Sequence, residues 1–159
     1  MRSRVSLLFD CCASTRWAAI VAGRLDECRD ELQFHELIDD VWWMLSPGDW
    51  LEAIDANPRP ALPEGAGSGP ALLREISDGL RAYEERFAMA YVARGQGRSA
   101  AELLLLLRRR LANPPAAELR VAAAEQAEIT RARLVHALGA PSANHAARPL
   151  RVPVPVQRM

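Results

Sequence analysis

The sequence predicts an all-α fold, a single-domain helical bundle of about six to eight helices. Apolar residues recur at three- and four-residue spacing along most of the chain, which is the period of a helix with one buried face. No segment shows the two-residue alternation of a half-buried strand. The 159 residues, 50% of them hydrophobic and 25% charged, suit one folded domain around a single core.

Four helices are expected in the first third of the chain. Ser14 is an N-cap residue, and Pro47 directly after Ser46 marks a helix start because proline is favoured at the first helical position. A wide apolar stripe predicts the longest of the four. Three nearby tryptophans are expected in the core: Trp42, Trp43 and Trp50. The helices are expected over residues 5–12, from Ser14 to Gly23, over residues 29–45, and from Pro47 through Ile54.

Three further helices follow a loop. Residues 57–70 hold four prolines and three glycines, which predicts the loop. Ser99 with Glu102 three residues later forms a capping-box pattern. The helices are expected over residues 71–92, over residues 99–111, and from the Asn113-Pro114-Pro115 break to Gly139. Residues 1–138 would then form the helical domain, and residues 139–159 a Pro- and Ala-rich extended tail.

Composition excludes several functional classes. Twenty basic and twenty acidic residues leave no net charge, whereas nucleic-acid binding normally requires a basic excess. No apolar run approaches the roughly 20 residues that cross a bilayer, and the polar N-terminus does not fit a secretory signal. Every basic residue is arginine, so a lysine-bound pyridoxal cofactor is excluded. We therefore expect a cytoplasmic protein without nucleic-acid or membrane partners.

Few side chains other than Arg133 indicate a binding site by pattern alone. The three cysteines lack metal-ligand spacing, and His35 with Asp39 fits a solvated pair better than a metal site. The run of residues 108–110 is typical of helix-terminal cations. Arg133 shares a largely apolar helix face with Ile129, Gln126 and Ala122. A guanidinium there needs an anion, either an internal carboxylate or a carboxylate-bearing ligand, and both remain open.

Several short motifs follow one another in a fixed order over residues 5–138. The N-terminal motifs are Cys11-Cys12-Ala13-Ser14-x-x-Trp17, Asp49-Trp50-Leu51-Glu52-Ala53 and Asn57-Pro58-Arg59. The C-terminal motifs are Tyr83-Glu84-Glu85-Arg86-Phe87, Gly97-Arg98-Ser99-Ala100-Ala101-Glu102-Leu103-Leu104, Arg110-Leu111-Ala112-Asn113, Glu118 and Ile129-x-x-x-Arg133-Leu134. In this order they resemble the OHCU decarboxylase family. OHCU is 2-oxo-4-hydroxy-4-carboxy-5-ureidoimidazoline, an intermediate between urate and allantoin.

The resemblance implies an all-helical homodimer that works without a cofactor or a metal. In the family, a His from a His-Pro-Arg/Lys-Ile-Gly motif and a Glu from a Ser-x-x-Glu-Gln motif handle carboxylate loss and proton delivery. Imidazole suits that task because it binds and releases a proton near neutral pH. An arginine near the C-terminus holds the substrate, and Arg133 occupies the matching position.

The chain departs from the family at the proton-transfer positions. The histidine slot reads Asn57-Pro58-Arg59-Pro60-Ala61, and asparagine has no usable proton equilibrium. The Ser-x-x-Glu-Gln motif is absent from a shortened loop, where Glu64 is the candidate remnant and Glu75 the alternative. The Phe-Gly-x-Pro-Phe segment, whose backbone helps line the family's pocket, reads Phe87-Ala88-Met89-Ala90-Tyr91.

These matches and departures give a working hypothesis. The chain is expected to be a divergent, cofactor-free enzyme that decarboxylates, cyclises or rearranges a carboxylated small molecule other than OHCU in a bacterial specialised pathway. One alternative is a non-catalytic ligand-binding or partner-stabilising dimer, and another is OHCU decarboxylation by a weaker route. Asn57 would orient a carbonyl, and Glu64 or Tyr91 would move protons. The catalytic candidates are Asn57 and Glu64, and the substrate-binding candidates are Arg133, Arg59, Phe87, Met89 and Tyr91.

Overall fold

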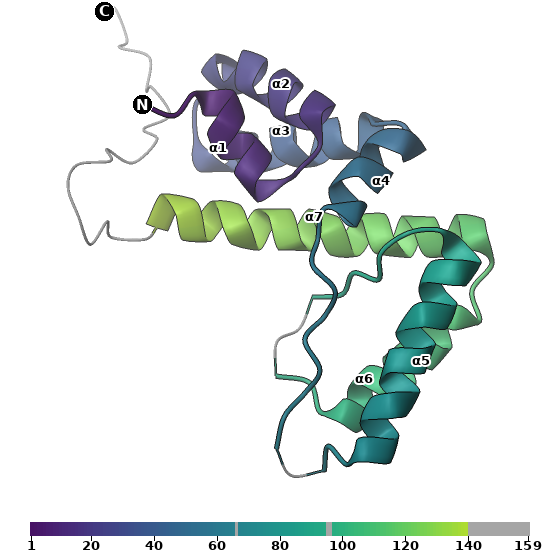
Figure 1. The fold of residues 1–159 in the computed structure, drawn as a ribbon. Helices are drawn as coiled ribbons and strands as arrows, with labels where there is room; N and C mark the ends of the chain where they lie inside the picture. The colour runs from purple at the N-terminus through teal and green to yellow at the C-terminus, as the bar shows by residue number, and fades with distance from the viewer. Residues whose placement is uncertain (66, 95–96, 140–159) are drawn as a thin grey trace, which may run out of the picture. The chain divides into compact units, whose positions relative to one another are not determined.

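A computed structural model describes residues 1–65, 67–94 and 97–139 (Figure 1). Within these ranges the chain forms seven α-helices and one short 3₁₀ helix, and no strand, which confirms the all-α prediction. The predicted tail lies outside the described residues beyond Gly139. The elements are α1 (Arg4–Cys11), α2 (Thr15–Arg24), η1 (Leu25–Glu27), α3 (Glu31–Met44), α4 (Pro47–Asp55), α5 (Pro70–Phe87), α6 (Ala100–Leu111) and α7 (Pro115–Gly139).

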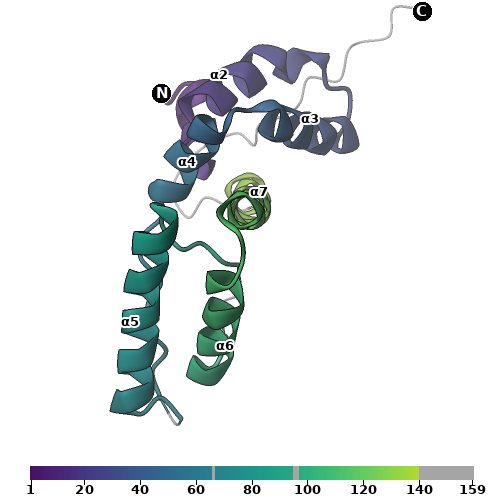
Figure 2. The same cartoon turned by 90° about the vertical axis from the view of Figure 1, so that its right-hand side faces the viewer.

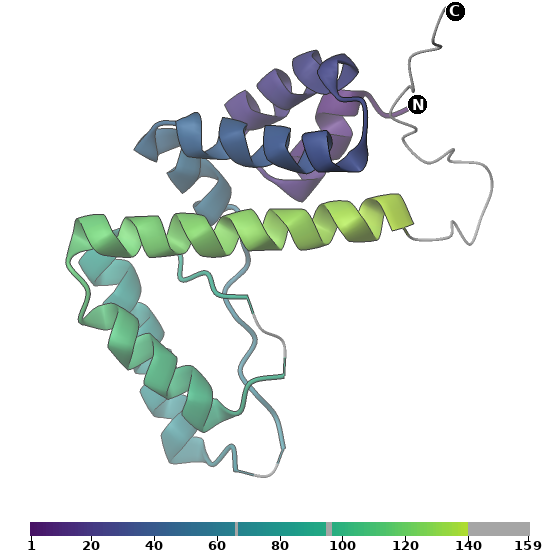
Figure 3. The ribbon, with the colours of Figure 1, turned by 180° about the vertical axis from the view of Figure 1, so that it is seen from behind.

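The chain divides into two compact units. Among the described residues, the first unit comprises residues 1–52 and 127–139, and the second lies within residues 53–126. The 25-residue helix α7 is continuous, as Figure 3 shows, and contributes its first half to the second unit and its second half to the first.

Side-chain caps set the helix starts that the sequence predicts. The Ser14 hydroxyl accepts a hydrogen bond from the backbone N–H of Trp17 at 3.3 Å, and Asp30 accepts one from Gln33 at 2.8 Å. Ser99 and the residue three positions later complete a capping box at α6. Each cap satisfies a backbone donor that the first helical turn leaves without an intrahelical partner.

The first unit is built around buried indole rings. The Trp17 ring nitrogen donates to the carbonyl oxygen of Ile38 at 3.0 Å, and that of Trp50 donates to the carbonyl oxygen of Trp42 at 2.8 Å. Trp43 is 44% exposed, so the prediction that it belongs to the core is wrong. It follows Trp42 on α3 and therefore lies about 100° around the helix, on the outer face.

The second unit is centred on α5 and α6, which lie side by side and run in the same direction (Figure 2). Gly79 sits at their close approach, because a Cβ added there would lie 2.7 Å from Cδ2 of Leu107. The buried side chains of this unit include Ile76, Leu80, Tyr83, Met89, Tyr91, Leu103, Leu104 and Leu107.

The predicted helix over residues 71–92 is wrong at its C-terminal end. The helix α5 ends at Phe87, and Ala88 adopts the left-handed conformation with φ 51° and ψ 38°. Residues 90–94 then run without regular structure. The backbone N–H of Ala90 donates to Oδ1 of Asp55 at 2.9 Å, so a contact outside the helix holds the segment in its non-helical path.

Candidate functional site

Asn57 lies where the chain leaves α4, and its side-chain amide is held by three acceptors. Nδ2 lies 3.0 Å from the carbonyl oxygens of both Ala53 and Ile54, and 2.6 Å from Oε1 of Gln126. Gln126 is fully buried on α7. The amide of Asn57 therefore satisfies the last carbonyls of α4 and ties them to α7, which is a structural task.

The candidate carboxylates lie at the surface of the second unit. Glu64 is exposed in the connection between α4 and α5. The alternative, Glu75, is also exposed and accepts a hydrogen bond from Nη2 of Arg108 at 2.8 Å. Arg59 is exposed and pairs with Glu84 through two hydrogen bonds, Nη2–Oε2 at 2.6 Å and Nε–Oε1 at 3.2 Å. An exposed guanidinium with this partner is a weak candidate for holding a substrate.

Two of the remaining three candidates of the second unit, Phe87 and Tyr91, lie against Tyr83. Met89 and Tyr91 are buried, and Phe87 is half-buried. The ring of Tyr83 lies 4.8 Å from that of Phe87 and 5.0 Å from that of Tyr91, centroid to centroid. The structure therefore brings the aromatic candidates together at one place in the second unit.

A buried charged cluster lies beside these rings and was not predicted as a site. Glu118 is fully buried and accepts hydrogen bonds from the Tyr83 hydroxyl at 2.6 Å, from Nε of Arg110 at 2.7 Å and from Nδ2 of Asn113 at 2.8 Å. Arg110 also donates to the carbonyl oxygen of Val92. The prediction of a helix-terminal cation run fits the exposed Arg108 and Arg109 but fails for Arg110, whose guanidinium is buried.

Arg133 is the one candidate that belongs to the first unit. Its side chain is half-buried on α7, and Nη1 donates to the carbonyl oxygen of Cys11 at 3.3 Å. Cys12 and Ser14, in the turn between α1 and α2, are fully buried. Burial raises the pKa of Cys12 to about 11, so its thiol keeps its proton at neutral pH. Arg133 therefore supplies positive charge beside uncharged groups of this turn.

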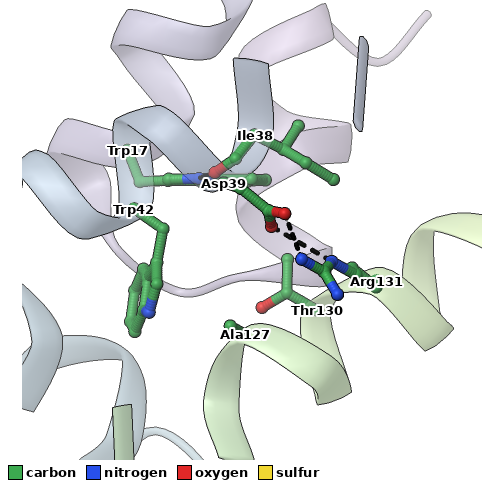
Figure 4. Close-up of a pocket in the computed structure, with 7 residues that line it drawn as sticks. All are labelled: Trp17, Ile38, Asp39, Trp42, Ala127, Thr130 and Arg131. Atoms are coloured by element: carbon green, nitrogen blue, oxygen red, sulfur yellow. Dashed lines mark hydrogen bonds and ion pairs between the residues drawn. The ribbon is translucent and has the colours of Figure 1, made fainter. Parts of the chain in front are cut away.

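A small hollow in the first unit lies next to an ion pair (Figure 4). Arg131 pairs with Asp39 through two hydrogen bonds, one of them Nε–Oδ1 at 3.0 Å. The cavity measures about 10 Å³, room for one water molecule, so it is not a substrate site. His35 lies 3.5 Å from Glu31, and among the described residues no group of three His, Cys, Asp or Glu side chains suits a metal. The hollow is lined by Trp17, Ile38, Asp39, Trp42, Ala127, Thr130 and Arg131.

Comparison with known proteins identifies the family. The family model for OHCU decarboxylase matches residues 2–135. The chain belongs to the OHCU decarboxylase family. A solved OHCU decarboxylase, crystallised in the presence of (S)-allantoin, is 26% identical and superposes with a TM-score of 0.64 over 80% of this chain and 93% of that one. The family's fold is thus the fold of this chain.

Two further relatives are partial matches. The uric acid degradation bifunctional protein TTL of Arabidopsis thaliana is 29% identical over 60% of this chain, and the chain spans only 36% of that protein's length. A solved (S)-allantoin synthase superposes with a TM-score of 0.70 over 82% of this chain and 48% of that one; at 19% identity it shows a shared fold. No helix in the described part of this family member is long and apolar enough to cross a membrane.

Proposed function

We propose that this chain is a cofactor-free enzyme of the OHCU decarboxylase type that acts on a carboxylated small molecule other than OHCU, in a bacterial specialised pathway. The observation that carries the proposal is the hydrogen bonding of the Asn57 side-chain amide, at the position where the family has its histidine. Its Nδ2 is shared among three acceptors, and an amide neither gains nor loses a proton near neutral pH. A reaction that depends on proton transfer by a histidine at this position therefore cannot proceed in the same way in this chain. We propose instead a substrate whose conversion does not require that histidine.

The proposed roles follow from the local surroundings. Arg133 holds the substrate carboxylate, since a half-buried guanidinium binds an anion more strongly than an exposed one. Asn57 positions the end of α4 rather than a substrate carbonyl, because its N–H groups already serve other acceptors. Burial raises the pKa of Tyr91, so its hydroxyl is a poor proton carrier near neutral pH. We therefore propose Glu64 as the proton-transfer group, with Glu75 as the alternative.

The names of the structural relatives suggest the ligand class. One was crystallised with (S)-allantoin present, and another is an (S)-allantoin synthase, so both are associated with a ureido-substituted ring. We therefore propose a ureido-carboxylate as the substrate class of this chain. Diureidoacetate, which carries two ureido groups and a carboxylate, is a suitable probe, and (S)-allantoin is the matching probe without a carboxylate.

Calorimetric titration with these two probes tests the role of Arg133. The Arg133→Ala variant should bind diureidoacetate about tenfold or more weakly than the wild type, and (S)-allantoin with a smaller change. Arg109→Ala is the matched control, because Arg109 is an exposed guanidinium on α6. Unchanged affinity for diureidoacetate in Arg133→Ala would contradict the proposed carboxylate site.

Turnover distinguishes the proposal from retained OHCU decarboxylation. Freshly generated OHCU should convert to (S)-allantoin no faster with the protein than without it, as followed by circular dichroism. Accelerated formation of the (S) enantiomer would instead show that the chain decarboxylates OHCU despite Asn57.

A non-catalytic ligand-binding dimer is the second candidate function. It is favoured because Asn57 cannot titrate and the Tyr91 hydroxyl keeps its proton. Conversion of bound diureidoacetate, followed by carbon-13 NMR, would exclude this candidate.

We also propose that the chain is a cytoplasmic homodimer, as the family resemblance implies. Light scattering should give twice the 17.5 kDa mass of one chain.

A further inference from the structure

The side of α3 that points away from the core of the first unit combines apolar and acidic side chains. Leu32 is 67% exposed and Trp43 is 44% exposed. They are 11 residues apart, close to three helical turns, so they lie on one side of the helix. Glu36 and Asp40 lie between them, are exposed, and form no ion pair with another residue of the described ranges. These four residues define the outer face of α3, which offers apolar contacts at both ends and two negative charges between them.

The C-terminal segment, residues 140–159, has the complementary composition. It contains three of the 20 basic residues of the chain and none of the 20 acidic ones, so its formal charge is +3 and that of residues 1–139 is −3. Its arginines alternate with apolar residues, as in Arg148-Pro149-Leu150-Arg151-Val152. A basic and apolar segment is attracted to an acidic and apolar face, because both charge and buried apolar area then favour the contact.

The position of the end of α7 allows this contact within one molecule. The helix ends at Gly139, on the side of the first unit where α3 begins (Figure 1 and Figure 3). The remaining 20 residues reach up to about 65 Å when extended, whereas the 14 residues of α3 span about 21 Å. The segment is therefore long enough to follow the whole of α3.

We propose that residues 140–159 bind to the outer face of α3 in the same chain. Arg148 and Arg151 lie beside the two carboxylates of the face, and the neighbouring apolar residues cover Leu32 and Trp43. Exposed ion pairs are individually weak, so the contact depends on the apolar area as well as on the charges. This interaction belongs to the first unit and does not depend on the proposed reaction.

The full-chain variant Glu36→Arg with Asp40→Arg tests the proposal. Losing two exposed ion pairs should shift the binding equilibrium about fivefold toward the released segment. Acrylamide should then quench the fluorescence of Trp43 more strongly, and the other three tryptophans interfere little because each is at most 7% exposed. Trypsin should also cleave the Arg151–Val152 bond faster in this variant than in the wild type, as followed by mass spectrometry.

Two further variants serve as controls. Asp78→Arg with Glu85→Arg makes the same change of charge at exposed positions of α5, and it should alter neither measurement. Adding Arg148→Glu and Arg151→Glu to the variant with the reversed face should restore the quenching of the wild type, because opposite charges then face each other again. Far-ultraviolet circular dichroism establishes that each variant keeps its helices.

Three outcomes would overturn the proposal. The first is equal quenching and equal cleavage in the wild type and the variant with the reversed face. The second is stronger quenching in that variant that the added glutamates do not restore, since the arginines of the segment would then not be the partners. The third is wild-type quenching that increases on dilution, which would place the segment on a second copy of the chain.

Discussion

Replacing Glu118 by glutamine should destabilise the protein strongly, although glutamine has almost the same volume. Glu118 is fully buried, and the side chain of its partner Arg110 is 5% exposed. The Glu118→Gln variant leaves the guanidinium buried without its counter-ion, and breaking a buried ion pair from one side costs about 3–5 kcal/mol. For a chain of this length, we expect the unfolding midpoint to fall by roughly 10 °C.

Urea unfolding followed by far-ultraviolet circular dichroism measures this loss. The control is Glu84→Gln, which breaks the more exposed pair with Arg59 and should cost no more than about 1 kcal/mol. The double variant Arg110→Met with Glu118→Leu should recover only part of the stability, because it leaves no buried charge but deprives the Tyr83 hydroxyl and the Val92 carbonyl oxygen of their partners. A Glu118→Gln variant within about 1 kcal/mol of the wild type would refute the view that this pair is tightly coupled.

Three further predictions concern single residues. Burial raises the pKa of the Cys12 thiol from 9.0 to about 11, so the stability that the neutral thiol contributes is complete below pH 9 and lost as the pH rises through 11. In alkaline urea titrations, the free energy of unfolding of the wild type should fall by about 2–3 kcal/mol over that interval relative to Cys12→Ala. Ala88→Gly should stabilise the protein by about 0.5–1 kcal/mol, since glycine adopts the left-handed conformation without strain; a lower midpoint would contradict this. Asn57→His should lose about 1–2 kcal/mol and gain no OHCU decarboxylation, because an imidazole cannot replace all three hydrogen bonds of the amide; accelerated formation of (S)-allantoin by this variant would contradict it.

Local signals were sufficient to predict most of the fold. Ser14 and Ser99 act through hydrogen bonds to residues three positions away, so their effect is visible in sequence spacing. The end of α5 is different. Phe87 and Tyr91 lie four residues apart and continue a helical pattern, yet Ala88 turns left-handed because contacts from Asp55 and the burial of Tyr91 decide the path. Spacing alone does not contain such tertiary contacts.

The candidate site was less predictable than the fold. The half-buried position of Arg133 follows from the apolar face of α7, which periodicity reveals. The burial of Arg110 does not, because a run of three arginines is usually a solvated helix end. One signal was present: Glu118, Ala122 and Gln126 recur at four-residue spacing, which places two polar side chains on the buried face of α7. Their partners, Arg110 and Asn57, are distant in sequence.

The surroundings of Asn57 support the proposal that this chain has lost the family's proton-transfer chemistry while keeping the fold. An amide that bonds the last carbonyls of α4 and the buried Gln126 stabilises the second unit regardless of any ligand. A group with such structural partners is not free to reorient around a substrate. The polar cluster around Tyr83 is tied together in a similar way, since Arg110 bonds Glu118 at 2.7 Å and stacks on the Tyr91 ring at 4.5 Å. Both groups of polar side chains therefore stabilise the second unit, whatever the chain binds.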